Sequence, residues 1–306
     1  MRVDYLLLQY TREAMRQMIS IIVCTVDRRD SLEATLSSIS GQTCRDYEVI
    51  LVNQGDLNDI DSWEGTLGNF KVISLRQRGL SIARNIGIQE ARGEILGFVD
   101  DDCILGEDWI KESIRTFERD AELAAVCGRI LAPDGRKPYL RLHSSDEKQI
   151  TYGNVETFSG GCILFRRKTF EKIGVFDEEL GVGQYLGSAE DTDICYRMLS
   201  RGMKVLYNPR IVCYHPSLAS VGWENLAKKL YSYNLGTGAV HAKHTLLTKG
   251  WKRILVIFNF LVLLLKPPLR IAQYVFLLQI PRSKGYCQVL NGRIAGFFYY
   301  LCRQVW

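Results

Sequence analysis

The sequence lacks several features that would place it in other classes of protein. No two of its nine cysteines form a CxxC pair and several lie in apolar runs, so we expect buried thiols in a reducing cytosol rather than disulfides or zinc. It has no low-complexity tract or short repeat, and its 47% hydrophobic and 24% charged residues are typical of a globular chain. Residues 1–20 lack the residue order of a signal peptide, and their apolar run 5–8 is too short to cross a bilayer.

Acidic side chains are scarce in one part of the chain. Residues 217–306 contain twelve Lys and Arg but one Asp or Glu, a net charge of +11, whereas residues 1–216 have a net charge of −6. Such a basic tail favours an anionic partner, either a membrane surface or a nucleic acid. We expect no nucleic acid, because a long Leu/Ile/Val/Phe run supplies neither base stacking nor groove reading.

The tail also lacks an unbroken apolar run of the about 20 residues that a straight membrane span needs. A helix with interleaved basic and aromatic residues is predicted over 223–244, followed by apolar runs at 254–265 and 269–280. Lys266-Pro267-Pro268 is expected to break the helix between the two runs. This pattern predicts amphipathic helices that lie in, or dip into, a membrane interface; a pair of core helices is the alternative.

The first 216 residues alternate between short apolar runs and helical patterns. Strands are predicted over 19–25, 47–53, 70–75, 95–99, 123–131, 204–207 and 211–214. Helices are predicted from Asp30 or Ser31 to Gly41 and over 80–92, 108–119, 168–173 and 189–200. This alternation predicts an α/β protein with a parallel, doubly wound sheet, and the weak pattern from Pro133 to Thr157 predicts a turn and a loop-rich insert.

Asp100, Asp101 and Asp102 directly follow an apolar strand. Three adjacent carboxylates repel one another unless a cation or a set of donors meets them. Open α/β sheets bind ligands at the carboxyl ends of strands, and oxygen ligands suit Mg²⁺ or Mn²⁺ together with substrate phosphates. The triplet therefore predicts a metal–diphosphate site; a solvated acidic turn that caps the helix near Glu107 is the alternative.

A second acidic group, Glu190 and Asp191, lies in the first turn of a predicted helix, after a glycine-rich loop at 181–187. These carboxylates could supply a general base, or only a favourable interaction with the helix dipole. His215 could complete a metal site beside an Asp pair, or could simply be packed. Arg84 could bind a phosphate, or could lie on a solvated helix face.

Together these groups resemble the family 2 glycosyltransferases over about residues 18–216. The matching motifs, in order, are Thr25-Val26-Asp27-Arg28, Ala83-Arg84-Asn85-Ile86-Gly87, Gly93-Glu94 ahead of Asp100-Asp101-Asp102, Ser159-Gly160-Gly161, Gly174-Val175-Phe176-Asp177-Glu178, Ala189-Glu190-Asp191-Thr192-Asp193 and Tyr214-His215-Pro216. The resemblance implies a GT-A fold. It also implies inverting transfer of a sugar from a nucleoside-diphosphate sugar donor, with Mg²⁺ or Mn²⁺ as the cofactor.

The resemblance also implies roles for individual residues. Nucleotide binding would fall to Thr25, Asp27, Asn53, Gln54, Arg84, Asp100 and Asp101. Metal binding would fall to Asp102 and His215, and catalysis to Asp191 as the base with Glu190 beside it. Val26 stands where the family usually has an aromatic residue, Asn53 where it has an acidic one, and Gln54 where it has Asp or Asn, so the donor nucleotide stays open.

The domain division that follows is an N-terminal extension (1–18), a GT-A domain (19–216) and a basic helical tail (217–306). The nucleotide half of the domain would cover about 19–132 and the acceptor half about 158–216. The tail resembles those of bacterial enzymes that build surface polysaccharide. It implies a lipid-linked or glycan acceptor and a position at the cytoplasmic face of the inner membrane, on its anionic surface.

Two other functions are weighed against glycosyl transfer. A sugar nucleotidyltransferase would usually carry a glycine-rich phosphate loop after the first strand, and residues 25–30 contain no glycine. A catalytically inactive binding or scaffold protein would keep the fold and lose the acids, whereas this chain keeps both acidic groups and His215.

Overall fold

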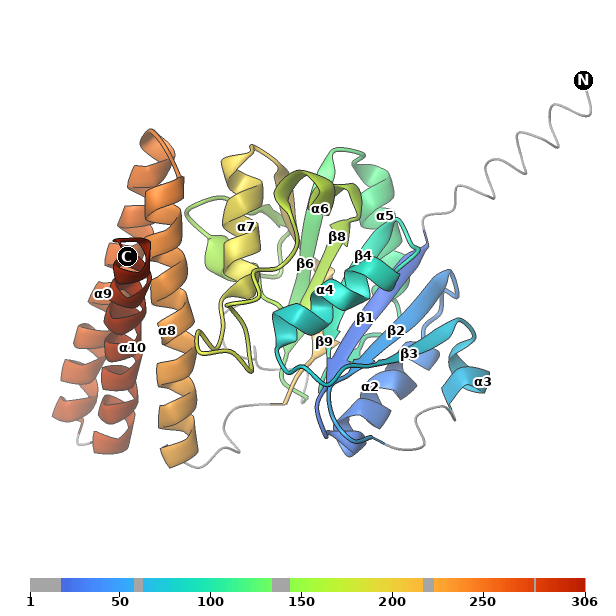
Figure 1. The fold of residues 1–306 in the computed structure, drawn as a ribbon, viewed down its shortest axis with the longest axis horizontal. Helices are drawn as coiled ribbons and strands as arrows, with labels where there is room; N and C mark the ends of the chain where they lie inside the picture. Colours follow the sequence, from blue (N-terminus) through green and yellow to red (C-terminus); the bar gives the residue numbers. More distant parts are fainter. Residues whose placement is uncertain (1–17, 58–62, 134–143, 217–222, 278, 306) are drawn as a thin grey trace, which may run out of the picture.

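The computed structural model describes residues 18–57, 63–133, 144–216, 223–277 and 279–305 (Figure 1). A nine-stranded sheet has the order β3-β2-β1-β4-β8-β6-β9-β5, with β7 also paired to β9. The strands are β1 (Ile19–Thr25), β2 (Tyr47–Asn53), β3 (Phe70–Ser74), β4 (Ile95–Asp100), β5 (Ile104–Leu105), β6 (Leu123–Leu131), β7 (Lys148–Gln149), β8 (Cys162–Arg166) and β9 (Lys204–Tyr214). The helices are α2 (Arg29–Ser40), α3 (Glu64–Leu67), α4 (Leu80–Glu90), α5 (Trp109–Arg119), the 3-10 helix η2 (Val155–Thr157), α6 (Lys168–Ile173), α7 (Glu190–Ser200), α8 (Trp223–Leu247), α9 (Trp251–Phe276) and α10 (Ile280–Val305).

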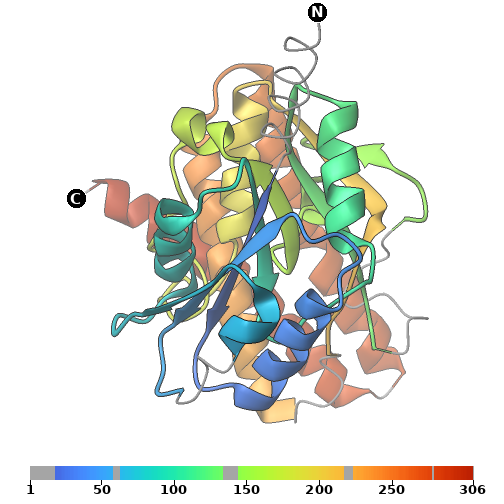
Figure 2. The same ribbon diagram turned by 90° about the vertical axis from the view of Figure 1, so that its right-hand side faces the viewer.

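Helices cover both faces of the sheet, because the side chains of its central strands are buried on both faces. In β1, Ile22 packs into the apolar cluster under α4, α6 and α7, whereas Ile21 and Val23 pack into the cluster under α2 and α5. This alternation follows from the two-residue period of a strand. Figures 1 and 2 show the resulting three layers, with the three long C-terminal helices at one side of the molecule.

The sheet is mixed rather than wholly parallel, so the prediction of a parallel sheet was wrong in part. Strands β1 to β4 are parallel to one another, but β8 is antiparallel to both β4 and β6. No strand was predicted at β8, where only four apolar residues precede Arg166. The predicted strands 204–207 and 211–214 form one strand, β9, whose register against β6 shifts between Cys127 and Arg129. The predicted start of α2 at Asp30 or Ser31 was also late, because the helix begins at Arg29.

The prediction that Lys266-Pro267-Pro268 breaks the tail was wrong, because α9 continues through both prolines. A proline at position 267 has no N–H for the carbonyl of Leu263, four residues earlier. Arg293 of α10 supplies a donor to that carbonyl, so one of the two helical hydrogen bonds that the prolines remove is replaced.

Helices α8, α9 and α10 run side by side at one edge of the molecule, and α8 lies between α9 and α7 (Figure 1). Glycines allow α10 to approach α8 closely. A Cβ on Gly238 would overlap the carbonyl of Arg293, and one on Gly296 would overlap the carbonyl of Leu235. Helix α10 was not predicted from the sequence. All nine cysteines lie in the described residues, and all are free thiols.

The register of the sheet gathers the candidate residues at one edge. Thr25 pairs with Asn53 across β1 and β2, and Cys24 pairs with Asp100 across β1 and β4. The carboxyl ends of three parallel strands therefore meet at one place, as expected for a ligand site in a sheet of this kind. The prediction for residues 1–17 and most of the turn predicted at 133–135 lie outside the described residues.

Candidate active site

The Asp triplet accepts hydrogen bonds from the end of β1 and the loop that follows it. Asp101 accepts hydrogen bonds from Thr25 (2.7 Å) and Arg28 (3.2 Å), and Arg28 also pairs with Asp102 (3.0 Å). Burial raises the pKa of Asp101, although the bonds from Thr25 and Arg28 oppose the rise. The triplet is thus a positioned group of carboxylates and not a solvated turn, and the helix that follows it has no side-chain cap.

Asp102 and His215 form a pair at the end of β9, with 3.1 Å between Oδ1 and Nε2. Burial acts to raise the pKa of Asp102, but the hydrogen bond and charge of His215 and the charge of Arg28 hold it below its usual value. One ligand atom from each of Asp100, Asp102, Cys103 and His215 lies within 4.8 Å of the others. Two carboxylates and an imidazole in this arrangement suit Mn²⁺ or Mg²⁺, and the buried thiol of Cys103 is the softer member of the set.

Arg84 connects the triplet to the second acidic group. Its guanidinium is almost fully buried and donates to Glu190 (2.8 Å), Asp100 (3.1 Å) and the carbonyl of Gly160 (3.3 Å). It also lies 5.4 Å from the centre of the Phe176 ring. One buried cation therefore joins the two carboxylate groups, and the nucleotide-binding role of Arg84 stays a prediction.

Glu190 and Asp191 are adjacent but lie in different surroundings. Glu190 is buried against Arg84, and burial raises its pKa to about 7 although the charge of Arg84 opposes the rise. Asp191 is half-buried and accepts hydrogen bonds from the amides of Gly160 (2.8 Å) and Thr192 (2.6 Å). Among the ion pairs between described residues, none includes Asp191.

The pKa of Glu190 leads to a prediction on stability. We expect the free energy of unfolding of the wild-type protein to fall relative to that of Glu190→Gln as pH rises from about 5 to about 8. Below the ordinary value of 4.5 the carboxyl is protonated in both states, whereas between 4.5 and about 7 only the unfolded chain releases its proton. Urea unfolding at several pH values would measure the difference. If the free energies of unfolding of wild type and Glu190→Gln changed with pH in parallel, the prediction would be contradicted. The exposed Glu33→Gln is the control, and its free energy of unfolding should follow that of the wild type.

The turn that leads into α7 is held by α8. Ala189 has φ of 72°, in the left-handed region that a non-glycine residue rarely adopts. The preceding Ser188 donates to the carbonyl of Tyr233 on α8 (2.5 Å), and a Cβ on Gly236 of α8 would overlap the carbonyl of Ser188. The strained turn that presents Glu190 and Asp191 is therefore fixed by a helix of the tail.

The residues predicted to hold the nucleoside lie together around the β1 and β2 ends. Asp27, with φ of 53°, accepts from the amide of Asp56 (2.8 Å) and pairs with Arg78 (3.2 Å). The side chain of Asn53 accepts from the amide of Gly55 (2.9 Å), and Gln54 donates to the carbonyl of Gly79 (3.2 Å). The side-chain amide of Asn53 thus stabilises the loop after β2, and that of Gln54 joins this loop to the residue that precedes α4.

Several residues of the site were missed by the sequence analysis. Arg28 and Gly160 were part of the quoted motifs, but nothing in the sequence indicated that they bind Asp102 and Asp191. A Cβ on Gly161 would lie 3.2 Å from Asp100, which explains the glycine there. Tyr233 has its pKa raised to about 12, by burial first and then by Asp100 and Glu190. It lies on α8, outside the motifs, so no sequence signal pointed to it.

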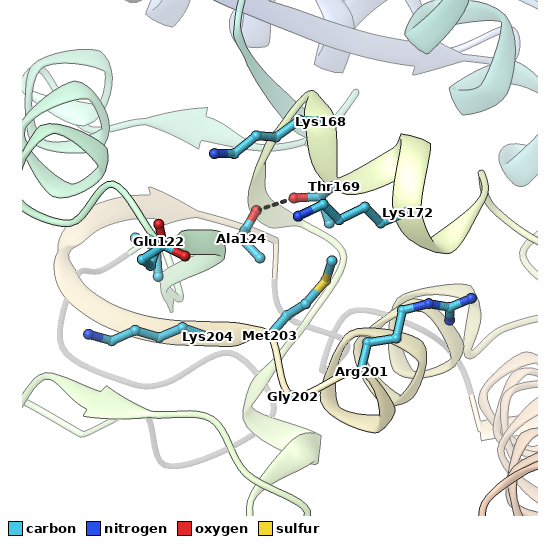
Figure 3. A pocket seen from close by; sticks show the side chains of 10 residues that line it. Glu122, Ala124, Lys168, Thr169, Lys172, Arg201, Gly202, Met203 and Lys204 are labelled. Atoms are coloured by element: carbon cyan, nitrogen blue, oxygen red, sulfur yellow. Dashed lines mark hydrogen bonds between the residues drawn. The ribbon is translucent and has the colours of Figure 1, made fainter.

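A cavity of about 300 Å³ lies at the opposite ends of β6 and β9, where both strands begin (Figure 3). Four cations and one carboxylate line it, contributed by Lys168, Lys172, Arg201, Lys204 and Glu122. It contains none of the acids described above, and it is therefore separate from the candidate active site.

Comparison with known proteins decides the family. Residues 20–174, about half of the chain, match the family model described as Glycosyl transferase family 2. The chain belongs to this family. The family 2 match and the acids at the strand ends support a transferase that moves a glycosyl group from a nucleotide-sugar.

Curated relatives agree with this family 2 assignment. A glucosyl-dolichyl phosphate glucuronosyltransferase of Haloferax volcanii is 27% identical over 215 residues, which cover 64% of this chain and 68% of that protein. A poly-beta-1,6-N-acetyl-D-glucosamine synthase of Staphylococcus aureus is 24% identical over 209 residues, 64% of this chain and 49% of the synthase. The family 2 chain thus spans about two thirds of the first relative and half of the second.

Solved structures show that the family 2 chain has a GT-A fold. A mannosyltransferase from Pyrobaculum calidifontis, in complex with GDP-Man and Mn²⁺, superposes with a TM-score of 0.65 at 17% identity over 94% of this chain and 88% of that one. Residues 1–349 of S. aureus TarS superpose with a TM-score of 0.55 at 17% identity over 94% and 92%. The expected GT-A sheet is thereby confirmed.

Proposed function

We propose that this enzyme transfers a sugar from a nucleoside-diphosphate sugar to an acceptor hydroxyl with inversion at the anomeric carbon. The observation that carries the proposal is the double pairing of Arg84 with Asp100 and Glu190. It links a carboxylate group suited to a metal–diphosphate with a carboxylate group suited to proton transfer, on one edge of one sheet. Inverting displacement needs both, a stabilised leaving group on one side and a base on the other.

Asp191 is the proposed base. It is half-buried, and hydrogen bonds from two amides orient it, so it can accept a proton from an acceptor hydroxyl. Glu190 is buried and paired with Arg84, and it is better suited to orient that arginine than to reach a substrate. Attack by the acceptor oxygen forms the new glycosidic bond, breaks the bond to the diphosphate and passes the hydroxyl proton to Asp191.

Asp102 and His215, with Asp100, would hold Mg²⁺ or Mn²⁺. The donor set fits such an ion because its oxygen and nitrogen atoms lie within 4.8 Å of one another at the carboxyl end of β4. When bound, the ion would offset the charge that develops on the leaving diphosphate. Thr25, Asp27, Asn53, Gln54 and Asp101 would surround the nucleoside, since they occupy the adjacent strand ends.

A lipid-linked or glycan acceptor is proposed, with the enzyme on an anionic membrane surface at its cytoplasmic face. Two observations support this. Helix α9 is long and apolar enough, by length and composition only, to cross a membrane, and the tail carries a net charge of +11. The relatives named above act, by their names, on a dolichyl phosphate sugar or make a polysaccharide.

Donor cleavage tests the proposal. With Mn²⁺ present, we expect release of free nucleoside diphosphate from one member of a panel of UDP-, dTDP- and GDP-sugars. Asp102→Asn should lower that release by on the order of 100-fold, because a metal ligand next to the diphosphate is lost, and EDTA should have the same effect.

The exposed Asp146→Asn is the matched control and should behave as the wild type. Release that persists undiminished in EDTA and in Asp102→Asn would overturn the metal–diphosphate assignment. If no donor is cleaved in water, adding a polyprenyl-phosphate sugar acceptor to the same panel tests whether transfer requires the acceptor. Failure there as well would overturn the proposed function.

A further inference from the structure

One side of α9 carries a stripe of exposed apolar side chains along its whole length. The stripe consists of Trp251, Ile254, Ile257, Phe258, Leu261, Leu265, Leu269, Val275 and Phe276. Most of these residues follow one another at intervals of three or four, so they share one face of the helix. The exposed fractions of Ile254, Leu265 and Leu269 are 66%, 65% and 72%, and a helix of 26 residues makes the stripe about 39 Å long.

The opposite side of α9 is fastened to the rest of the enzyme. Val256, Phe260, Leu263 and Pro267 are buried there. Asn259 donates to the carbonyl of Tyr152, ahead of η2, and Lys252 donates to the carbonyl of Ser200 at the end of α7 (3.1 Å). Helix α9 therefore packs along α8 and α10, as Figure 1 shows, and these two hydrogen bonds join it to the catalytic domain.

The charges of α9 are all positive, and two of them lie beside the stripe. The helix contains Lys252, Arg253, Lys266 and Arg270, and it contains no Asp or Glu. At 100° per residue, Arg253 and Lys266 project about 110° to either side of the stripe. An apolar face edged by cations is the pattern of a helix in the boundary between lipid headgroups and acyl chains.

This packing excludes a perpendicular crossing of the bilayer. If the middle of α9, near Leu264, lay at the centre of a hydrocarbon core of about 30 Å, Lys266 and Arg270 would lie within about 10 Å of that centre. Arg293, which binds the carbonyl of Leu263, and the loop at Tyr152 would be carried into the core with them. Unpaired cations and irregular backbone at that depth are strongly unfavourable.

We infer that α9 lies flat on an anionic lipid surface, with its apolar stripe in the headgroup–acyl boundary and Arg253 and Lys266 among the phosphates. This inference deepens the membrane association of the proposed function and rests on it. A second copy of the chain is a poorer occupant, because it would bring the same cations against those of the first.

The depth of labels along α9 tests the orientation. Single cysteines at Ile254, Leu265 and Phe276 carry a fluorophore, in a full-length chain whose Cys44, Cys287 and Cys302 are replaced by serine. Vesicles of phosphatidylcholine and phosphatidylglycerol contain lipids brominated at different acyl positions. We expect all three labels to be quenched most by the shallow bromines and to the same extent. Strongest quenching of the Leu265 label by deep bromines, with shallow labels on both sides, would mean a crossing helix and would overturn the inference.

Vesicle binding of charged variants tests the surface itself. Leu261→Asp and Leu265→Asp should each lower binding at least about tenfold, because a charge enters the apolar boundary. Val175→Asp changes an exposed apolar residue on another part of the enzyme and should bind as the wild type does. Equal binding to vesicles without phosphatidylglycerol, or a dimer in solution that Leu265→Asp dissociates, would overturn the lipid assignment.

Donor cleavage in the same preparations separates the two proposals. Leu265→Asp should cleave donor at the wild-type rate in the absence of vesicles, since its side chain points away from the catalytic domain. Loss of vesicle binding with retained donor cleavage would therefore be an effect on the apolar stripe of α9 and not on the active site. Absence of donor cleavage in the wild type, both in water and with the polyprenyl-phosphate sugar acceptor added, is a failure of the proposed function alone.

Discussion

Replacing Asp191 by asparagine is expected to lower kcat for sugar transfer by about 10²–10⁴-fold and to leave KM for the donor unchanged. Loss of a general base has an effect of this size. Asparagine keeps the shape of the side chain and can still accept from one of the two amides, that of Gly160 or that of Thr192, so the turn and the donor site should persist. Steady-state transfer to a hydroxyl acceptor, measured over donor concentration, gives both constants.

The neighbouring carboxylate provides the contrast. Glu190→Gln changes the partner of Arg84 and should raise KM for the donor, since Arg84 also orients Asp100. If Asp191→Asn instead raised KM and kept kcat, Asp191 would be a binding residue and the base would have to be sought elsewhere. A far-ultraviolet spectrum and thermal unfolding of both variants verify that they are folded.

Much of the fold could be predicted because its signals are local. Strands β1, β2 and β6 are seven to nine residues long and mostly apolar, and α5 and α7 have clear helical patterns. Strand β8 was not predicted, because its four apolar residues before Arg166 do not distinguish a strand from a buried helical segment. The continuity of α9 through Pro267 depends on Arg293, which lies twenty-six residues further along the chain. A contact of that kind cannot be read from local sequence.

The same distinction holds for the site. The acids could be found because adjacent carboxylates at the end of a strand repel one another unless a cation or a set of donors meets them. What each acid binds could not be found, because the partners come from distant segments: Thr25 for Asp101, Gly160 for Asp191 and Arg84 for both groups. The contribution of α8 was the hardest to predict, because Ser188 donates to the backbone carbonyl of Tyr233 and not to its side chain.

A buried network joins α8 to the helix that carries the proposed base. Asp193 of α7 is fully buried and binds Lys243 (2.7 Å) and His244 (2.9 Å) of α8, together with Arg197 (2.9 Å). Burial acts to raise the pKa of Asp193, but the hydrogen bond of His244 and the charges of Arg197 and Lys243 hold it well below the usual value. The ionised form is therefore the one that stabilises the fold at neutral pH, and that stabilisation is lost as pH falls through the acidic range.

Asp193→Ala is expected to lower the free energy of unfolding by about 3–5 kcal/mol at pH 7. Removing one member of a buried ionic group leaves the others buried without a counter-charge, and effects of this size follow. Urea unfolding measures the change. Asp177→Ala is the matched control, because Asp177 binds the same Lys243 (2.7 Å) at a more exposed position, and it should cost less than about 1 kcal/mol.

Equal losses in Asp193→Ala and Asp177→Ala would contradict the role given to the network. So would a stable Asp193→Ala enzyme with full transfer activity. The tail would then be an attachment whose position does not affect the catalytic turn. The expected loss of stability would mean that the position of the tail does affect the catalytic turn. Helix α8 also holds Ser188 and so fixes the strained Ala189 ahead of Glu190 and Asp191. Helix α8, on which α9 and α10 pack, is then as much a part of the active site as the sheet.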